Sequence, residues 1–117
     1  MRNIIRLKDY TKDDIKEIFK IADDLQEEKY KNFLDGKIIA MFFPNTSIRT
    51  RVTFERGIYL LGGQSIIFLP ETLNKKEKIE DVAGYLNNWI DAAVIRYNDI
   101  LLLDELAKYA NFSIIRY

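Results

Sequence analysis

An apolar run, a turn and a helix follow one another directly between residues 38 and 63, and this succession constrains the fold more than any other feature. Residues 38–43 (IIAMFF) are typical of a strand buried on both faces. Turn-forming residues occupy positions 44–47 (PNTS). Apolar residues then recur at helical spacing and two glycines at 62 and 63 form a stop signal, so the sequence predicts a helix over residues 50–61.

The start of this helix has the composition of an anion site. Residues 47–51 (SIRTR) bring two hydroxyl groups and two guanidinium groups to the point where a strand has ended and a helix begins. Free backbone N–H groups and the positive end of the helix dipole also point outward there. These groups suit a phosphate-like dianion. The alternative is a hydroxyl residue that merely caps the helix beside two surface arginines. The coincidence of strand, turn, hydroxyls and arginines favours the anion site.

The rest of the chain alternates helices and strands, which predicts an α/β fold in one domain. Because helices separate the strands, right-handed crossovers and a parallel sheet are expected. With the strand order 2-1-3-4 this is a three-layer fold of about four strands, with helices on both faces. The pattern predicts strands over 37–43, 64–69, 91–96 and 113–116. It also predicts one helix that begins at Thr11, one that carries Ile79 to Ile90, and one over 99–110. Residues 70–77 are predicted to form a polar loop.

A parallel sheet binds ligands beyond the carboxyl ends of its strands, at the point where the strand order switches. In the order 2-1-3-4 this point lies between the first and third strands. Arg96 is the last residue of the predicted third strand. We therefore expect Arg96 to reach the same crevice as Ser47, Arg49 and Thr50, the alternative being a solvated strand end.

Composition excludes several classes of function. Lysine plus arginine and aspartate plus glutamate both number 18, so the zero net charge leaves no electrostatic footprint for nucleic acid or an acidic membrane. No apolar run approaches the length of a membrane span and no signal peptide is evident, so a cytoplasmic protein is expected. The absence of cysteine excludes disulfides and zinc–sulfur sites. Because histidine is also absent, any chemistry must run without imidazole or borrow it from residues that this chain lacks.

Four segments carry a family resemblance: LKDYTKDDIKEIF, FPNTSIRTRVTFERGIYLLGGQ, KKEKIEDVAGYL, and DAAVIR together with ELAKYA. Through them the chain resembles the amino-terminal, carbamoyl-phosphate-binding domain of the aspartate and ornithine carbamoyltransferases. The resemblance implies transfer of a carbamoyl group from carbamoyl phosphate to an amino-acid amine, with release of phosphate and without a metal or organic cofactor. Ornithine is favoured over aspartate as the acceptor, and hence a role in arginine metabolism, because FPNTSIRTRVTFE and ELAKYA are more similar to that branch.

The resemblance also implies roles for single residues. Ser47, Arg49 and Thr50 would bind phosphate oxygens, assisted by the backbone N–H of Ile48. Thr50 and Arg96 would polarise the carbamoyl carbonyl. The family has threonine or glycine where this chain has Ile48. The isoleucine keeps the N–H but lacks a hydroxyl donor, and one hydrogen bond to a charged group is worth about 1.5–3 kcal/mol.

A second implied feature is a shared site between subunits. The loop over 73–77 would complete a neighbouring subunit's site, with Lys75 or Lys76 contacting the anion, and the intact family assembles as trimers. Glu77 would pair with Arg49. The family's H-P-x-Q element and its amino-acid-binding domain have no counterpart in residues 1–117. We therefore expect an incomplete carbamoyl-phosphate-binding domain that is inactive alone and that self-associates.

Two alternatives remain at this point. One is a non-catalytic phosphate-binding or assembly module of the same fold. The other is a receiver-like or flavodoxin-like module, although a receiver needs acidic residues where this chain's first strand ends in Phe42-Phe43-Pro44.

Overall fold

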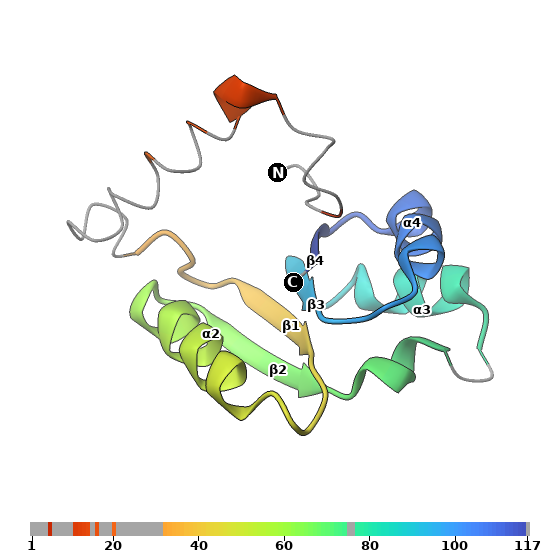
Figure 1. The fold of residues 1–117 in the computed structure, drawn as a ribbon, viewed down its shortest axis with the longest axis horizontal. Coiled ribbons are helices and arrows are strands. Elements are labelled where there is room, and N and C mark those ends of the chain that lie inside the picture. Colours follow the sequence, from red (N-terminus) through yellow and green to blue (C-terminus); the bar gives the residue numbers. More distant parts are fainter. Residues whose placement is uncertain are drawn as a thin grey trace.

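The computed structural model of the chain describes residue 5, residues 11–14, 16 and 20, and the ranges 32–74 and 77–116. Its elements alternate as predicted, and their ends agree with the prediction to within a few residues. In chain order they are β1 (Ile38–Phe42), α2 (Ile48–Leu60), β2 (Gln64–Phe68), the 3-10 helix η2 (Pro70–Asn74), α3 (Ile79–Leu86), β3 (Ala92–Ile95), α4 (Ile100–Tyr109) and β4 (Ser113–Arg116) (Figure 1).

All four strands are parallel and lie in the order β2-β1-β3-β4, which confirms the predicted topology. β1 and β3 are the two central strands and lie side by side, with Phe42 opposite Ile95 at their carboxyl ends. β2 and β4 are the edges of the sheet. The chain therefore turns from one half of the sheet to the other between β1 and β3, where the switch point was expected.

Alternate residues of β1 enter two separate cores, because successive side chains of a strand point to opposite faces. Ile39, Met41 and Phe43 pack on the α2 side with Ile58. Ala40 and Phe42 belong to a larger core on the other side, which includes residues of α3 and α4. Figure 1 shows α2 on one side of the sheet and α3 and α4 on the other. The expected three-layer arrangement is confirmed.

The two glycines end α2 as predicted. The N–H of Gly63 donates to the carbonyl of Ile58 at 2.9 Å, and the N–H of Gly62 donates to that of Tyr59 at 3.0 Å. This pair of hydrogen bonds is a Schellman motif, which requires the left-handed conformation that Gly62 adopts with φ of 89°. A side chain at position 62 would also collide with the side chain of Asp35. The backbone conformation therefore favours glycine here, and a side chain would in addition displace that of the exposed Asp35.

The start of the predicted amino-terminal helix is also confirmed. The N–H of Thr11 donates to the carboxylate of Asp14 at 2.9 Å, and the N–H of Asp14 donates to the Thr11 hydroxyl at 3.1 Å. This reciprocal arrangement is a capping box, and residues 12–14 are helical. Most of the remainder of that predicted helix lies outside the described residues.

The segment predicted as a polar loop over 70–77 is wrong in its first part, which forms η2. Pro70 suits the first position of a helical turn because its φ is already fixed near the helical value. Leu73 is only 1% exposed and packs in the core on the α3 and α4 side. A single leucine among polar residues carries no periodicity, so the pattern did not reveal this element.

Other element ends differ from expectation as well. α3 ends at Leu86, so Ile90 lies beyond the helix that was predicted to carry it. α2 begins at Ile48, two residues earlier than predicted, because the N–H of Arg51 already bonds to the carbonyl of Ser47 at 2.9 Å. Arg96 follows β3 and is not its last residue. Its N–H nevertheless donates to the carbonyl of Phe42 at 3.0 Å, so the backbone of Arg96 is still held by β1.

Candidate functional site

The predicted site residues lie where β1 and β3 end. After β1 the chain passes through a short turn, in which the N–H of Ser47 donates to the carbonyl of Pro44 at 3.0 Å, and enters α2. After β3 it reaches Arg96 directly. The register of the two strands therefore brings the start of α2 and Arg96 to the same edge of the sheet.

A hydrogen bond joins these two segments. The Nη1 atom of Arg96 donates to the Oγ atom of Ser47 at 2.8 Å, although the two residues are 49 positions apart in the sequence. Ser47 is 5% exposed, whereas Arg96 is largely exposed. The expected proximity of the two residues is therefore present in the structure. A charged donor on a buried hydroxyl makes this contact stronger than a neutral one.

The hydroxyl of Ser47 does not cap α2. Ser47 occupies the N-cap position, yet its side chain accepts no hydrogen bond from the backbone of the first turn. The carbonyl of Ser47 accepts the first helical hydrogen bond, from Arg51, so the N–H groups of residues 48–50 precede the helical ladder. Within the described part of the chain these three N–H groups have no acceptor. A simple capping role therefore does not account for Ser47.

The start of α2 is electrostatically positive. Its first turn contains no acidic residue. None of the three guanidinium groups of Arg49, Arg51 and Arg96 forms an ion pair with a described carboxylate. The helix dipole adds a partial positive charge at the same place. A helix start with the exposed guanidinium groups of Arg49 and Arg96 nearby and no acid in its first turn has the electrostatic character of an anion site.

The remaining members of the predicted site differ in exposure. Arg49 is exposed, Thr50 is half-buried, and the side chain of Ile48 is 67% exposed. The carbonyl of Arg49 accepts a hydrogen bond from the Thr53 hydroxyl at 2.9 Å. The backbone N–H of Ile48 therefore stays available at the helix start, while its side chain is an apolar group at the surface.

Arg51 belongs to the basic element at the helix start but received no individual role from the sequence. Its position, four residues after Ser47 and three before Phe54, places it on the inward face of α2. The Nε atom of Arg51 is buried and has no hydrogen-bond acceptor. Helical spacing alone was sufficient to indicate this inward position. Its unpaired Nε depends on side-chain packing and could not be read from the pattern.

Of the residues expected to serve the shared site and its pairing, Glu77 is among those that the structure describes. Lys75 and Lys76 lie outside the described residues. Glu77 is exposed, and within the described ranges no ion pair joins it to Arg49. The pairing of Glu77 with Arg49 stays a prediction.

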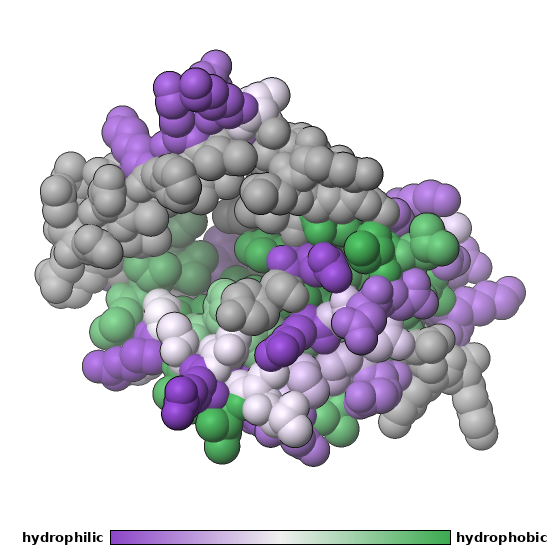
Figure 2. Space-filling model, viewed as in Figure 1, coloured by the Kyte–Doolittle hydropathy of each residue, from purple (hydrophilic) through white to green (hydrophobic). Residues whose placement is uncertain are grey.

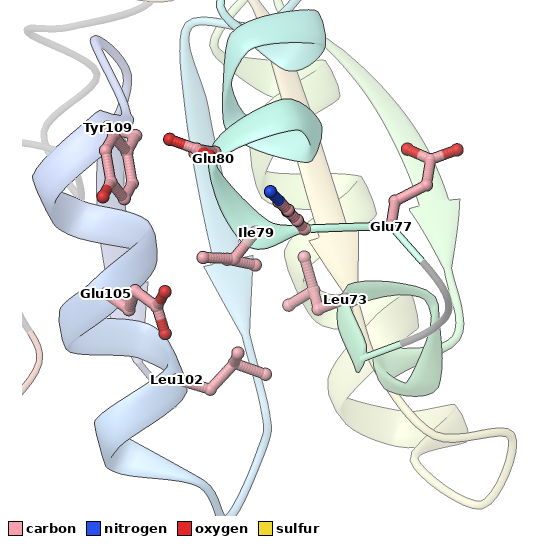
Figure 3. Close-up of a pocket in the computed structure, with 8 residues that line it drawn as sticks. Leu73, Glu77, Ile79, Glu80, Leu102, Glu105 and Tyr109 are labelled. Atoms are coloured by element: carbon pink, nitrogen blue, oxygen red, sulfur yellow. The ribbon is translucent and has the colours of Figure 1, made fainter.

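Glu77 instead borders a pocket of about 240 Å³ between η2, the start of α3 and α4. Figure 3 shows the apolar side chains of Leu73, Ile79 and Leu102 reaching into the space between these elements. The other lining residues are polar or aromatic: Glu77, Lys78, Glu80, Glu105 and Tyr109. This hollow has more negative than positive side chains and is distinct from the crevice at Ser47 and Arg96.

The described part of the chain has neither a metal-binding cluster nor a membrane-spanning helix. Among those residues, no group of three or more histidine, cysteine, aspartate or glutamate side chains is placed to hold a metal ion. No described helix has the length and apolar character needed to cross a membrane.

Comparison with known proteins gives consistent matches. The family model described as "Aspartate/ornithine carbamoyltransferase, carbamoyl-P binding domain" matches residues 2–117. The ornithine carbamoyltransferase of Campylobacter hominis is 36% identical, the alignment covering 98% of this chain and 40% of the relative. That of Halalkalibacterium halodurans is 37% identical, with coverages of 97% and 38%. The chain thus spans about two fifths of the length of these curated relatives.

Solved structures give the same result. The anabolic ornithine carbamoyltransferase from Campylobacter jejuni superposes with a TM-score of 0.86 and 30% identity, covering 99% of this chain and 39% of that one. The ornithine carbamoyltransferase from Pyrococcus furiosus superposes with a TM-score of 0.80 and 34% identity, covering 98% and 39%.

Proposed function

Because this chain belongs to the aspartate/ornithine carbamoyltransferase family, whose carbamoyl-phosphate-binding domain it matches over residues 2–117, we propose that it forms the carbamoyl-phosphate site of a carbamoyltransferase. The observation that carries the proposal is the hydrogen bond between Ser47 and Arg96. It joins a helix start suited to phosphate with an arginine suited to a carbonyl oxygen, which are the two ends of carbamoyl phosphate.

The proposed reaction places charge where this crevice has donors. An amine attacks the carbonyl carbon, a C–N bond forms, and negative charge develops on the carbonyl oxygen. The C–O bond to phosphate then breaks, and the electron pair leaves with the phosphate. Thr50 and Arg96 would stabilise the first charge, and Ser47, Arg49 and the N–H of Ile48 the second. The described residues at the crevice include no general base, so the amine proton would leave with phosphate or through another part of the enzyme.

We propose ornithine as the acceptor in the whole enzyme. The relatives reported above carry the name ornithine carbamoyltransferase and are longer than this chain, so the acceptor would bind to a second domain of the enzyme. Such an enzyme would act in arginine metabolism in the cytoplasm. A non-catalytic module would bind the same anion, and an assay for carbamoyl transfer by the whole enzyme separates the two.

We further propose that the protein forms homo-oligomers, with the family trimer as the expected form and the loop over 73–77 reaching a neighbouring site. Apolar side chains that remain exposed support this proposal. Figure 2 shows apolar surface over both α2 and α4, between charged side chains. On the α2 and β2 side the exposed large residues are Ile48, Val52, Tyr59, Leu60, Ile66 and Ile67. β2 is also an edge strand, and edges and apolar patches favour association.

Titration with carbamoyl phosphate tests the site directly. Backbone amide NMR of the chain is expected to show shifts at residues 47–51 and at Arg96. Shifts confined to the pocket beside Glu105, with residues 47–51 unmoved, would contradict the assignment. Sedimentation equilibrium at micromolar concentration tests association, and a soluble 13.8 kDa monomer would contradict it.

A further inference from the structure

We propose that Ser47, besides donating to the phosphate, positions Arg96, so that one hydroxyl sets the distance between the two charge-stabilising halves of the crevice. This inference rests on the proposed function. Its starting point is that the Arg96 side chain, although largely exposed, is held at 2.8 Å on a hydroxyl that is 5% exposed.

A free arginine at a strand end would sample many rotamers, and fixing such a side chain costs up to about 2 kcal/mol of entropy. Arg96 is anchored at two points instead. Its backbone N–H donates to the carbonyl of Phe42 at 3.0 Å, and its Nη1 donates to Ser47. Among the described residues the other N–H groups of its guanidinium have no acceptor, so they are left for a ligand.

Ser47 is itself fixed by the backbone. Its N–H donates to the carbonyl of Pro44 at 3.0 Å, and its carbonyl accepts from the N–H of Arg51 at 2.9 Å. The position of Oγ is therefore set by the turn and by the first turn of α2.

The direction in which the Ser47 hydroxyl proton points follows from its contact with Arg96. A serine hydroxyl has one proton and two lone pairs. Because Arg96 occupies a lone pair and no backbone N–H of the helix start is capped, the hydroxyl proton of Ser47 points away from Arg96. That proton is the single donor that the side chain can offer to a phosphate oxygen, and the contact with a cation polarises it.

The proposal predicts that loss of the Ser47 hydroxyl weakens two kinds of ligand by different factors. Loss of the hydroxyl removes one donor to the phosphate and also frees Arg96. A ligand with a phosphonate group alone loses only the donor. A ligand with both a phosphonate and a carbonyl group also loses the preorganised arginine. If Ser47 served the phosphate alone, both ligands would weaken by the same factor.

The experiment compares methylphosphonate with phosphonoacetamide, which adds a carbamoyl-like carbonyl to the phosphonate and is not consumed. Dissociation constants are measured by NMR titration of the 117-residue chain and its variants. Ser47→Ala is expected to weaken methylphosphonate about tenfold and phosphonoacetamide about a hundredfold, since each charged hydrogen bond lost is worth a factor on the order of ten or more. Ser47→Thr keeps a hydroxyl and is expected to restore the preference for phosphonoacetamide.

Two controls separate positioning from a general loss of structure. In an Arg96→Ala background, Ser47→Ala is expected to weaken both ligands by the same factor, because no arginine remains to be positioned. Ser65→Ala removes a half-buried serine from β2, away from the crevice, and is expected to change neither constant. The amide spectrum of each variant reports whether it remains folded.

The outcomes are distinct. Equal weakening of both ligands by Ser47→Ala in a folded chain overturns the inference and leaves the proposed function standing. The inference is also overturned if a folded Ser47→Thr variant does not prefer phosphonoacetamide over methylphosphonate. If the unmodified chain binds neither ligand, the proposed function falls, and the inference with it.

Discussion

Two regions of this domain differ in almost every respect. The predicted crevice at the ends of β1 and β3 has a helix start, the hydrogen-bonded side chains of Ser47 and Arg96, and no acid in the first turn of α2. The pocket between η2, α3 and α4 has three glutamates, one lysine and an apolar floor. The structure has a hollow at the pocket, whereas polar groups from distant segments converge at Ser47 and Arg96. This convergence of donors at a switch point, and not the hollow, is the basis of the proposed site.

Leu73→Ala should give the largest effect and should affect the pocket side alone. Leu73 is 1% exposed in the core beneath the pocket, so its truncation is expected to lower the free energy of unfolding by about 2–5 kcal/mol. Urea denaturation measures this change. Leu101→Ala is the matched control, because Leu101 is 77% exposed and its truncation should have little effect. A Leu73→Ala variant as stable as Leu101→Ala would show that η2 is not part of the core.

Arg49→Ala should affect the crevice side alone. Arg49 is an exposed guanidinium at the positive start of α2, without a described ion-pair partner. Its loss is expected to weaken phosphate binding by about 1.5–3 kcal/mol, with little change in the free energy of unfolding. Isothermal titration with inorganic phosphate checks this. Unchanged affinity in a folded variant would remove Arg49 from the site.

Ile48→Thr should strengthen phosphate binding at the crevice. The Ile48 side chain is 67% exposed, so a threonine fits without repacking and adds a hydroxyl donor at the helix start. An increase in phosphate affinity of about 1 kcal/mol is expected, at the lower end of the range for a hydrogen bond to a charged group. Ile48→Val is the control, since it has the shape of threonine without the hydroxyl. Equal gains in both variants would mean that the hydroxyl is not the cause.

Glu105→Gln should give the smallest effect. Glu105 is exposed and borders the pocket, so removing its charge is expected to change both phosphate affinity and stability by less than about 0.5 kcal/mol. The same titration and denaturation experiments measure both quantities. A large gain in phosphate affinity from Glu105→Gln would place the anion in the pocket and reverse the comparison.

Local patterns were sufficient for most of the fold. The apolar run that forms β1, the turn after it and the glycines that end α2 each follow from short-range rules on burial, turn chemistry and left-handed backbone. The pattern of strands separated by helices was sufficient for a parallel sheet, and the strand order chosen as the fold hypothesis is the observed one. η2 was missed because a lone buried leucine among polar residues has no period.

Pattern and topology alone place a basic helix start after the first strand and Arg96 at the same edge of the sheet. The contacts of the side chains depend on the folded chain. The Ser47 hydroxyl holds Arg96 instead of capping α2, the Arg51 Nε is buried without an acceptor among the described residues, and Glu77 borders a pocket that Arg49 does not line. A side chain forms hydrogen bonds only with groups within about 3 Å. Ser47 and Arg96, 49 positions apart in the sequence, reach that distance only when the sheet has formed.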